Sequence, residues 1–192
     1  MPEMPEGVKE GVVKGMYKFK ASKKKNAKLK AQLFGSGTIL NEVIKAQEIL
    51  EEEYKIAADV WSVTSYKELR RDGLDVDRWN MLHPTEKQKV SYISKVLKNE
   101  SGVFVAASDY VKALPDTISK WFPRPLMSLG TDGFGRSEGR AELRDFFEVD
   151  AKHIALAALY ALYREDKIKT NVIEKAMKDL NINPDKANPM IS

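Results

Sequence analysis

The most unusual segment of the sequence combines glycines with an acid, an aromatic ring and an arginine. It contains Asp132, Gly133, Phe134, Gly135 and Arg136 in succession. Glycine lets a backbone approach a neighbour closely, and arginine can hold a carboxylate or a phosphate through two parallel hydrogen bonds. A ligand-binding loop and a sharply folded structural loop are both consistent with this segment, and we keep both interpretations.

A second glycine-containing turn, Gly35-Ser36-Gly37-Thr38, follows a strand-like segment. Backbone amides at such a turn can bind phosphate when a helix follows. A dinucleotide fingerprint would place a third glycine at position 40, which is leucine, and would end the next strand with an acid. We therefore favour a plain strand-to-helix turn and keep Gly35, Ser36, Gly37 and Thr38 as a weak anion-site candidate.

A third candidate position follows the continuous apolar segment 102–107, where Asp109 and Tyr110 stand after Ser108. Asp109 and Asp132 both follow predicted strands. They can act as paired carboxylates only if those two strands are neighbours in the sheet.

Histidine and cysteine are scarce. The chain has 192 residues, no cysteine and two histidines, so disulfides, thiolate chemistry and cysteine-based metal sites are excluded, and we expect no metal site. His83 precedes Pro84, and we favour a loop-ordering hydrogen bond for it over a general-base role. His153 lies in an apolar helical segment and is expected to be a satisfied, half-buried histidine.

Charge and hydropathy limit the possible partners. The net charge is +4, and the lysines of segment 22–28 lack the arginines and aromatics typical of a nucleic-acid surface, so we expect a solvated loop and no nucleic-acid partner. No run approaches the roughly 18 apolar residues of a membrane span, and the first residues do not resemble a signal peptide. We expect a cytoplasmic protein with no membrane partner.

The elements that would position these residues alternate along the chain. Strands are predicted at 16–21, 29–34, 57–64, 102–107 and 126–129, the first two as an antiparallel hairpin at a sheet edge. Helices are predicted at 39–50, from 66, at 92–97, at 110–122 with Pro115 bending or dividing it, after Ser137 as cap, at 151–163 and from 170. Residues 72–89 are expected to be irregular.

This alternation predicts a three-layer α/β fold. A mostly parallel five-stranded sheet with one antiparallel edge strand would carry helices on both faces. We expect a single domain over residues 1–192, with a lead-in and edge hairpin at 1–28, an alternating core at 29–137 and C-terminal helices at 138–192. Chemistry in such sheets collects beyond the carboxyl ends of the strands, where the glycine-containing segments lie.

Five strings in register resemble one family. They are QLFGSGTIL at 32–40, DVWSVTSYKELRRDG at 59–73, RWNMLHP at 78–84, ASDY at 107–110 and LGTDGFGRS at 129–137. The chain resembles, over essentially its whole length, the C-terminal regions of the homodimeric bacterial pyruvate dehydrogenases, the thiamine-dependent first components of pyruvate dehydrogenase complexes. The resemblance implies a domain of the transketolase C-terminal type.

The resemblance also implies what this chain lacks. Family members are several times longer, and they bind thiamine diphosphate and magnesium between two upstream domains, where their catalytic histidines also lie. Asp132-Gly133 has no asparagine downstream at the spacing of the family's diphosphate motif. We therefore expect no catalytic residue, no cofactor-binding residue and no cofactor in this chain alone.

The partners that the resemblance implies are the upstream thiamine-binding domains, a second subunit in a homodimer, and the lipoyl-bearing acyltransferase that receives the acetyl group made from pyruvate. The residues expected to face the active-site approach or an interface are His83, Asp109, Tyr110 and residues 132–136. Two alternatives stay open: a self-contained module that binds a small anionic ligand, and an assembly module that binds another component of the complex.

Overall fold

The computed structural model describes residues 3–24 and 26–192. Five strands form one sheet in the order β1-β3-β2-β4-β5. Their bounds are β1 Met16–Lys20, β2 Lys30–Ser36, β3 Ala57–Val63, β4 Val103–Ala107 and β5 Leu126–Leu129. β2 pairs in parallel with β3 and β4, β4 pairs in parallel with β5, and β1 runs antiparallel to β3 at one edge. The predicted fold class is confirmed.

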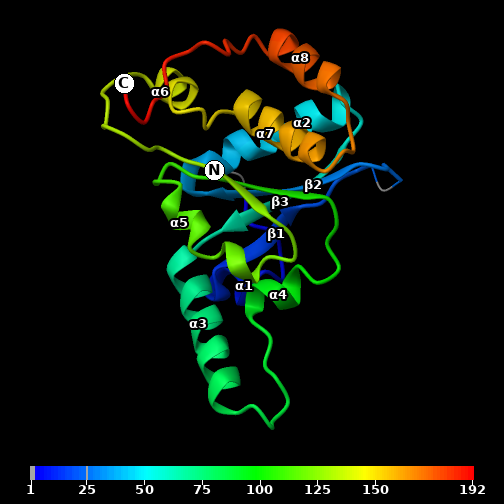
Figure 1. Cartoon of the computed structure of the whole chain (residues 1–192), viewed down its shortest axis with the longest axis vertical. Coiled ribbons are helices and arrows are strands. Elements are labelled where there is room, and N and C mark those ends of the chain that lie inside the picture. The colour runs from blue at the N-terminus through cyan, green and yellow to red at the C-terminus, as the bar shows by residue number, and fades with distance from the viewer. Residues whose placement is uncertain (1–2, 25) are drawn as a thin grey trace.

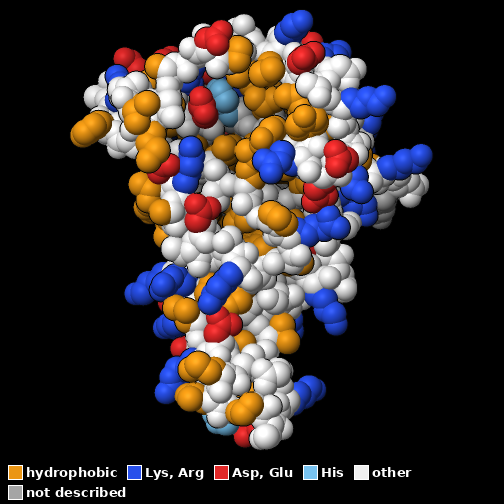
Figure 2. All heavy atoms as spheres, viewed as in Figure 1, with side chains coloured by type: hydrophobic (Ala, Val, Ile, Leu, Met, Phe, Trp, Pro, Cys, Tyr) orange, Lys and Arg blue, Asp and Glu red, His pale blue; other side chains and the backbone are white. Residues whose placement is uncertain are grey.

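Helices cover both faces of this sheet (Figure 1). α2 (Leu40–Glu52), α6 (Arg140–Phe146), α7 (Ala151–Arg164) and α8 (Thr170–Asp179) lie on one side. α1 (Lys9–Lys14), α3 (Tyr66–Leu82), α4 (Tyr92–Val96) and α5 (Ala113–Asp116) lie on the other. Short 3-10 turns occur at Gly37–Ile39 and Ser119–Trp121. The far end of α3 and the loop after it project from the body as a narrow extension, which the space-filling view also shows (Figure 2).

Alternating side chains along the strands build a separate core on each face. Leu33 of β2 is buried in the α2–α7 layer, whereas its neighbour Phe34 is buried on the opposite face. Phe34 stacks on Trp61 and Phe104 and meets Phe122 edge-on, with ring centroids 5.2–6.1 Å apart. This period of two is what a sheet covered on both faces requires.

The predicted hairpin is wrong, because β1 pairs with β3 and not with β2. Six of the seven residues of β2 are buried. This strand lies inside the sheet, because it pairs in parallel with β3 on one edge and with β4 on the other. β1 is held at the outer edge of β3, where the backbone amides of Thr64 and Ser65 both donate to the Gly15 carbonyl, at 2.8 and 3.1 Å.

Residues 72–82 are helical, so the predicted irregular stretch is also wrong over this part. α3 continues to Leu82 because no proline interrupts it before Pro84 and because Gly73 lets Trp121 pack directly on the helix backbone. The start of α3 is as predicted, since the Ser65 hydroxyl accepts from the Glu68 amide at 3.2 Å.

The predicted helix at 110–122 is broken more severely than expected. α5 is a single turn that contains Pro115, a 3-10 turn follows, and residues 110–112 lie outside both. Proline lacks the amide that would continue the helix. Ser137 does not cap α6, which begins after Gly139. Asp150 does cap α7, and its carboxylate accepts from the His153 amide at 3.1 Å.

Candidate functional site

A cleft of about 370 Å³ opens where the carboxyl ends of β2, β4 and β5 meet. It combines residues from these strand ends with residues of α6 and the segment after it. The lining residues are Thr38, Ile39, Asp109, Thr131, Gly133, Phe134, Gly135, Arg136, Arg140, Leu143, Arg144, Phe147 and Val149. The structure thus brings together Thr38, Asp109 and the 133–136 segment, which the sequence placed at separate strand ends.

Two buried serines fix the ends of the central strands beneath the cleft. The Ser36 and Ser108 hydroxyls lie 2.8 Å apart across β2 and β4, and Ser108 also accepts from the Tyr110 amide at 3.1 Å. The Tyr66 side chain is buried behind them. Burial raises the pKa of the Tyr66 phenol, and the nearby charge of Asp109 raises this pKa further. The phenol is therefore neutral across the physiological pH range.

The Gly35–Thr38 turn has a structural explanation for each glycine. A side chain at Gly35 would meet the Leu40 backbone at 2.9 Å, so glycine lets the start of α2 pack against the strand. Gly37 has a φ of +53°, in the left-handed region that favours glycine. These contacts support the strand-to-helix turn, while Thr38 still faces the cleft.

Asp109 and Asp132 follow neighbouring strands but differ in role. The Asp132 carboxylate accepts from the Lys112 amide at 3.0 Å and lies 3.9 Å from the Lys112 ammonium, so it holds the β4 and β5 loops together. Thr131 adds to this connection by donating from its hydroxyl to the Asp109 carbonyl at 2.5 Å. The Asp109 side chain lines the cleft instead.

Three arginines line the cleft together with Asp109, and two of them already have partners. The Arg144 guanidinium donates to the buried Glu42 carboxylate at 2.9 Å, and the Arg136 guanidinium lies 4.4 Å from the Phe146 ring centroid. Arg140 forms no ion pair with any described residue. Arg140, Arg144 and Glu42 were not among the residues predicted from the sequence. The one signal for them was Glu42, an acid within the apolar stripe of the predicted helix at 39–50.

The 130–137 loop presents both glycine and an exposed aromatic ring at the cleft. Gly133 has a φ of +90°, and the backbone of Pro189 and Met190 packs against it, so the C-terminal tail rests on this loop. Phe134 is 81% exposed. Tyr110, beside the cleft, is 60% exposed. Two large aromatic side chains are thus exposed to solvent beside the charged residues of the cleft.

His83 is not part of the cleft. It lies just beyond the C-terminal end of α3, where its Nδ1 is 2.8 Å from the Trp79 carbonyl oxygen and its ring stacks on Trp79 with centroids 4.5 Å apart. The hydrogen bond agrees with the loop-ordering role predicted for it. The structure therefore separates His83 from the other candidate residues.

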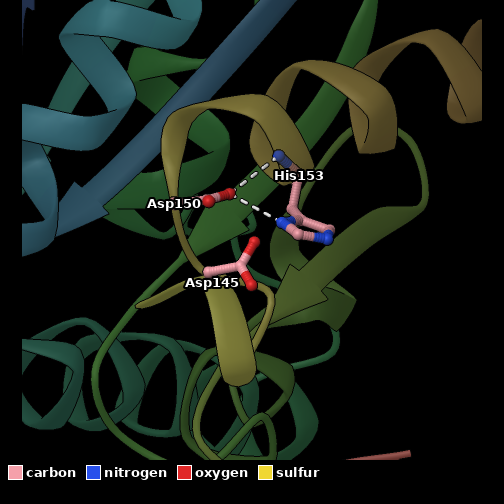
Figure 3. Close-up of side chains that lie close together, drawn as sticks. All are labelled: Asp145, Asp150 and His153. Carbon is pink, nitrogen blue, oxygen red and sulfur yellow. Dashed lines mark hydrogen bonds and ion pairs between the residues drawn. The ribbon is translucent and has the colours of Figure 1, made fainter. Parts of the chain in front are cut away.

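Asp145, Asp150 and His153 form the one cluster of possible metal ligands among the described residues (Figure 3). His153 Nδ1 lies 2.6 Å from Asp150, which agrees with the predicted satisfied histidine, although the side chain is buried and not half-buried as predicted. The Lys152 ammonium lies 2.5 Å from Asp145 and 3.9 Å from Asp150, and its hydrogen bond holds the pKa of Asp145 below its ordinary range. A lysine thus already supplies the cation here, and an ion-pair network accounts for the cluster.

The lining of the cleft suits binding of a ligand but offers no pair of groups for acid–base catalysis. Among the described residues, its lining combines apolar side chains with three arginines, one carboxylate and two threonines, without histidine, lysine or tyrosine. Such a surface suits an anionic or amphipathic group, or another part of a protein.

Comparisons with known proteins agree on the family. Residues 15–150 match the model of the transketolase-like TK C-terminal domain. The chain is 48% identical over 190 residues to the pyruvate dehydrogenase E1 component of Pseudomonas aeruginosa, and 45% identical over 193 residues to that of Escherichia coli K12. These matches cover 98% and 100% of this chain but only 21% of each relative, so the chain spans about a fifth of their length.

Solved structures show the same fold. A transketolase from Pichia stipitis superposes with a TM-score of 0.57 at 15% identity, covering 86% of this chain and 20% of that one. The transketolase from Leishmania mexicana gives a TM-score of 0.53 at 16% identity over 81% of this chain and 19% of that one. Among the described residues, no helix combines the length and the apolar character that crossing a membrane would need.

Proposed function

This chain belongs to the transketolase C-terminal-like family and matches the C-terminal region of pyruvate dehydrogenase E1 components, and on that basis we propose that it is a non-catalytic domain of such an enzyme. The observation that carries the proposal is identity of 45–48% along practically the whole chain to proteins of which it spans 21%. The domain would pack against the rest of the enzyme, contribute to a homodimer and shape the outer approach to the active site.

The activity proposed for the whole enzyme is oxidative decarboxylation of pyruvate, with the acetyl group passing to a lipoyl group on the acyltransferase of the complex. Thiamine diphosphate, with magnesium, would supply the electron sink for decarboxylation. We propose that parts of the enzyme outside this chain bind both, and that the enzyme works in the cytoplasm. The names of the relatives and the resemblance of the five strings support this proposal.

The cleft residues do not fit this cofactor. A magnesium ion bound to a diphosphate takes one or two carboxylates from the protein and keeps several waters, whereas the only carboxylate in the described lining of the cleft is that of Asp109, which shares the lining with three arginines. Asp132 is already engaged by Lys112. No step of the reaction is therefore assigned to these side chains.

What this chain can supply is a charged, partly apolar surface at the strand ends. Phe134 and Tyr110 are exposed beside the cleft, with Arg136 and Asp109 in its lining. Apolar side chains rimmed by charges are typical of a surface that meets another protein segment. We propose that this surface faces the approach to the active site in the full enzyme.

The proposal is tested by titrating the isolated chain with thiamine diphosphate in the presence of magnesium, with heat as the signal. We expect no saturable binding, because the described lining of the cleft has one carboxylate beside three arginines and Asp132 is engaged by Lys112. An E1 component titrated in parallel is the positive control. Saturable binding by the isolated chain would contradict a non-catalytic role.

A module for a small anion is the second candidate function. The observation that favours it is Arg140, which lines the cleft without an ion-pair partner among the described residues, next to Arg136. Titration with inorganic phosphate tests it. Saturable phosphate binding that is lost in the Arg140→Ala variant would support this function. Equal heats of titration for the unsubstituted chain and the variant would exclude it.

A further inference from the structure

The projection at the end of α3 carries no buried residue. Residues 74–90, which we call the arm, comprise the last part of α3 and the loop that returns to α4, and each of them is exposed or half-buried. The flanking Gly73 and Ser91 are both buried, so the arm leaves and rejoins the body at defined points. Figure 1 shows it extending away from the sheet.

Specific contacts nevertheless hold the arm in one shape. The Asn80 side chain donates to the Lys89 carbonyl at 3.0 Å and accepts from the Lys89 amide at 2.8 Å, which joins the loop to the helix. His83 stacks on one ring of this region, Trp79, and the Lys89 ammonium lies 4.0 Å from the same ring. These contacts between the loop and the helix indicate that the arm has one defined conformation.

The base of the arm is fixed as firmly. Trp121 packs on the bare backbone of Gly73, and its indole donates to Asp77 at 3.2 Å. Asp77 also lies 2.6 Å from Lys120, whose hydrogen bond lowers the pKa of this carboxyl. Where the chain rejoins the body, the amide of Tyr92, the first residue of α4, donates to Asp72 at 2.6 Å. The arm is therefore preorganised from base to tip.

The outer part of this rigid arm presents apolar side chains to solvent. Met81 is 71% exposed, Leu82 51% and Val90 63%. The space-filling view shows such side chains gathered at the narrow lower end of the molecule (Figure 2). Ordering a segment costs conformational entropy, and no residue of the arm is buried within the domain to offset that cost.

We infer that the arm is a docking element whose apolar tip is covered by the part of the E1 polypeptide that lies outside this chain. The inference rests on the proposed function. The matching region makes up only 21% of the length of the relatives, so under the proposed function a large protein surface would be covalently tied to this domain. The segment proposed to cover the tip would thus belong to the same polypeptide as the arm.

The small size of the tip favours a tethered partner over a free one. Three side chains of this kind offer on the order of 300 Å², whereas a stable complex of separate proteins buries roughly 800 Å² on each side. A segment of the same polypeptide does not pay the full cost of association, because its effective concentration is high. A second copy of this chain would have to find most of its contact area elsewhere.

The experiment uses a chimera in which this chain replaces the matching region of the Escherichia coli E1 component. Amide hydrogen exchange of residues 74–90 is compared between the chimera and the isolated chain, and a photo-reactive residue at position 82 identifies what lies against the tip. We expect about tenfold or greater slowing of exchange in the chimera, with cross-links to peptides from outside the 192 residues.

Variants separate docking from folding. Met81→Glu with Leu82→Glu should leave thermal unfolding of the isolated chain unchanged, because both side chains are exposed there, but should abolish the slowing in the chimera. Ile191→Glu, an equally exposed apolar residue (83%) in the C-terminal tail, is the matched control and should keep the slowing.

An arm that exchanges equally fast in both proteins would overturn the inference, as would cross-links confined to a second copy of this domain. A chimera that turns over pyruvate yet leaves the arm unprotected would refute the docking role alone. A chimera that folds but is inactive for every variant would instead count against the proposed function.

Discussion

Replacing Glu42 by alanine tests how the cleft wall is attached to the sheet. Glu42 is 6% exposed, and its carboxylate accepts from Arg144 at 2.9 Å and from the Ala151 amide, the first of α7, at 3.3 Å. It therefore connects α2 to both α6 and α7. The third contact, with Lys45 at 3.2 Å, involves an exposed ammonium and contributes little.

Removing one member of a buried ion pair costs about 3–5 kcal/mol, because the other charge stays buried without a partner. Since the Arg144 side chain keeps 20% of its exposure, we expect the lower end of this range, about 3 kcal/mol, for Glu42→Ala. For a chain of this size that corresponds to a fall in melting temperature of roughly 6–12 °C. Glu42→Gln keeps an acceptor and should cost about half as much.

The assay is urea unfolding of the isolated chain followed by circular dichroism. Glu52→Ala, an exposed residue of the same helix, is the control and should change the free energy of unfolding by less than about 0.5 kcal/mol. Adding Arg144→Met to Glu42→Ala should recover about 1–2 kcal/mol relative to the sum of the single changes. A loss below about 1 kcal/mol for Glu42→Ala, or additive effects of the two substitutions, would show that the Glu42–Arg144 pair does not hold α6 to α2.

Three further outcomes follow from the structure. Gly73→Ala should lower the free energy of unfolding by about 1–3 kcal/mol, because the new methyl group collides with the Trp121 ring; an unchanged urea midpoint would show that the ring can move. Ser36→Ala should cost about 1 kcal/mol by losing the hydrogen bond between the β2 and β4 ends, also measured by urea unfolding. Burial pushes the pKa of Asp59 up, but hydrogen bonds, above all from Lys18, leave it below its ordinary value. The ionised Asp59 carboxylate therefore stabilises the folded chain fully above its unfolded-state pKa of about 3.9. This contribution is lost as the pH falls through the lower folded-state pKa of Asp59. Asp59→Asn should flatten the stability profile in that acidic range, and identical profiles would contradict this assignment.

The strand ends could be predicted from the sequence because each turn is encoded locally. A buried strand followed by Gly35–Thr38, by Ser108-Asp109 or by the 130–137 loop implies a parallel strand end, and parallel ends meet at one edge. Hence Thr38, Asp109 and Arg136 line one cleft. The predicted capping residues Ser65 and Asp150 also depend on neighbours three residues away.

The rest depends on contacts between residues far apart in the chain. The place of β1 beside β3 follows from the burial of β2, which no local pattern of residues 16–34 contains. The continuation of α3 past Gly73 requires Trp121, which lies 48 residues later in the sequence. Arg140 and Arg144 join the cleft only because α6 folds back over the strand ends.

We propose that this chain serves as the C-terminal domain of a pyruvate dehydrogenase E1 component. The most direct test is pyruvate turnover, measured as acetyl transfer to the lipoyl-bearing acyltransferase, by the chimera with the Escherichia coli E1 component. We predict activity within about tenfold of the parent enzyme, with the parent lacking the matching region as an inactive control. A folded chimera that binds thiamine diphosphate but is no more active than that truncated control would contradict the claim.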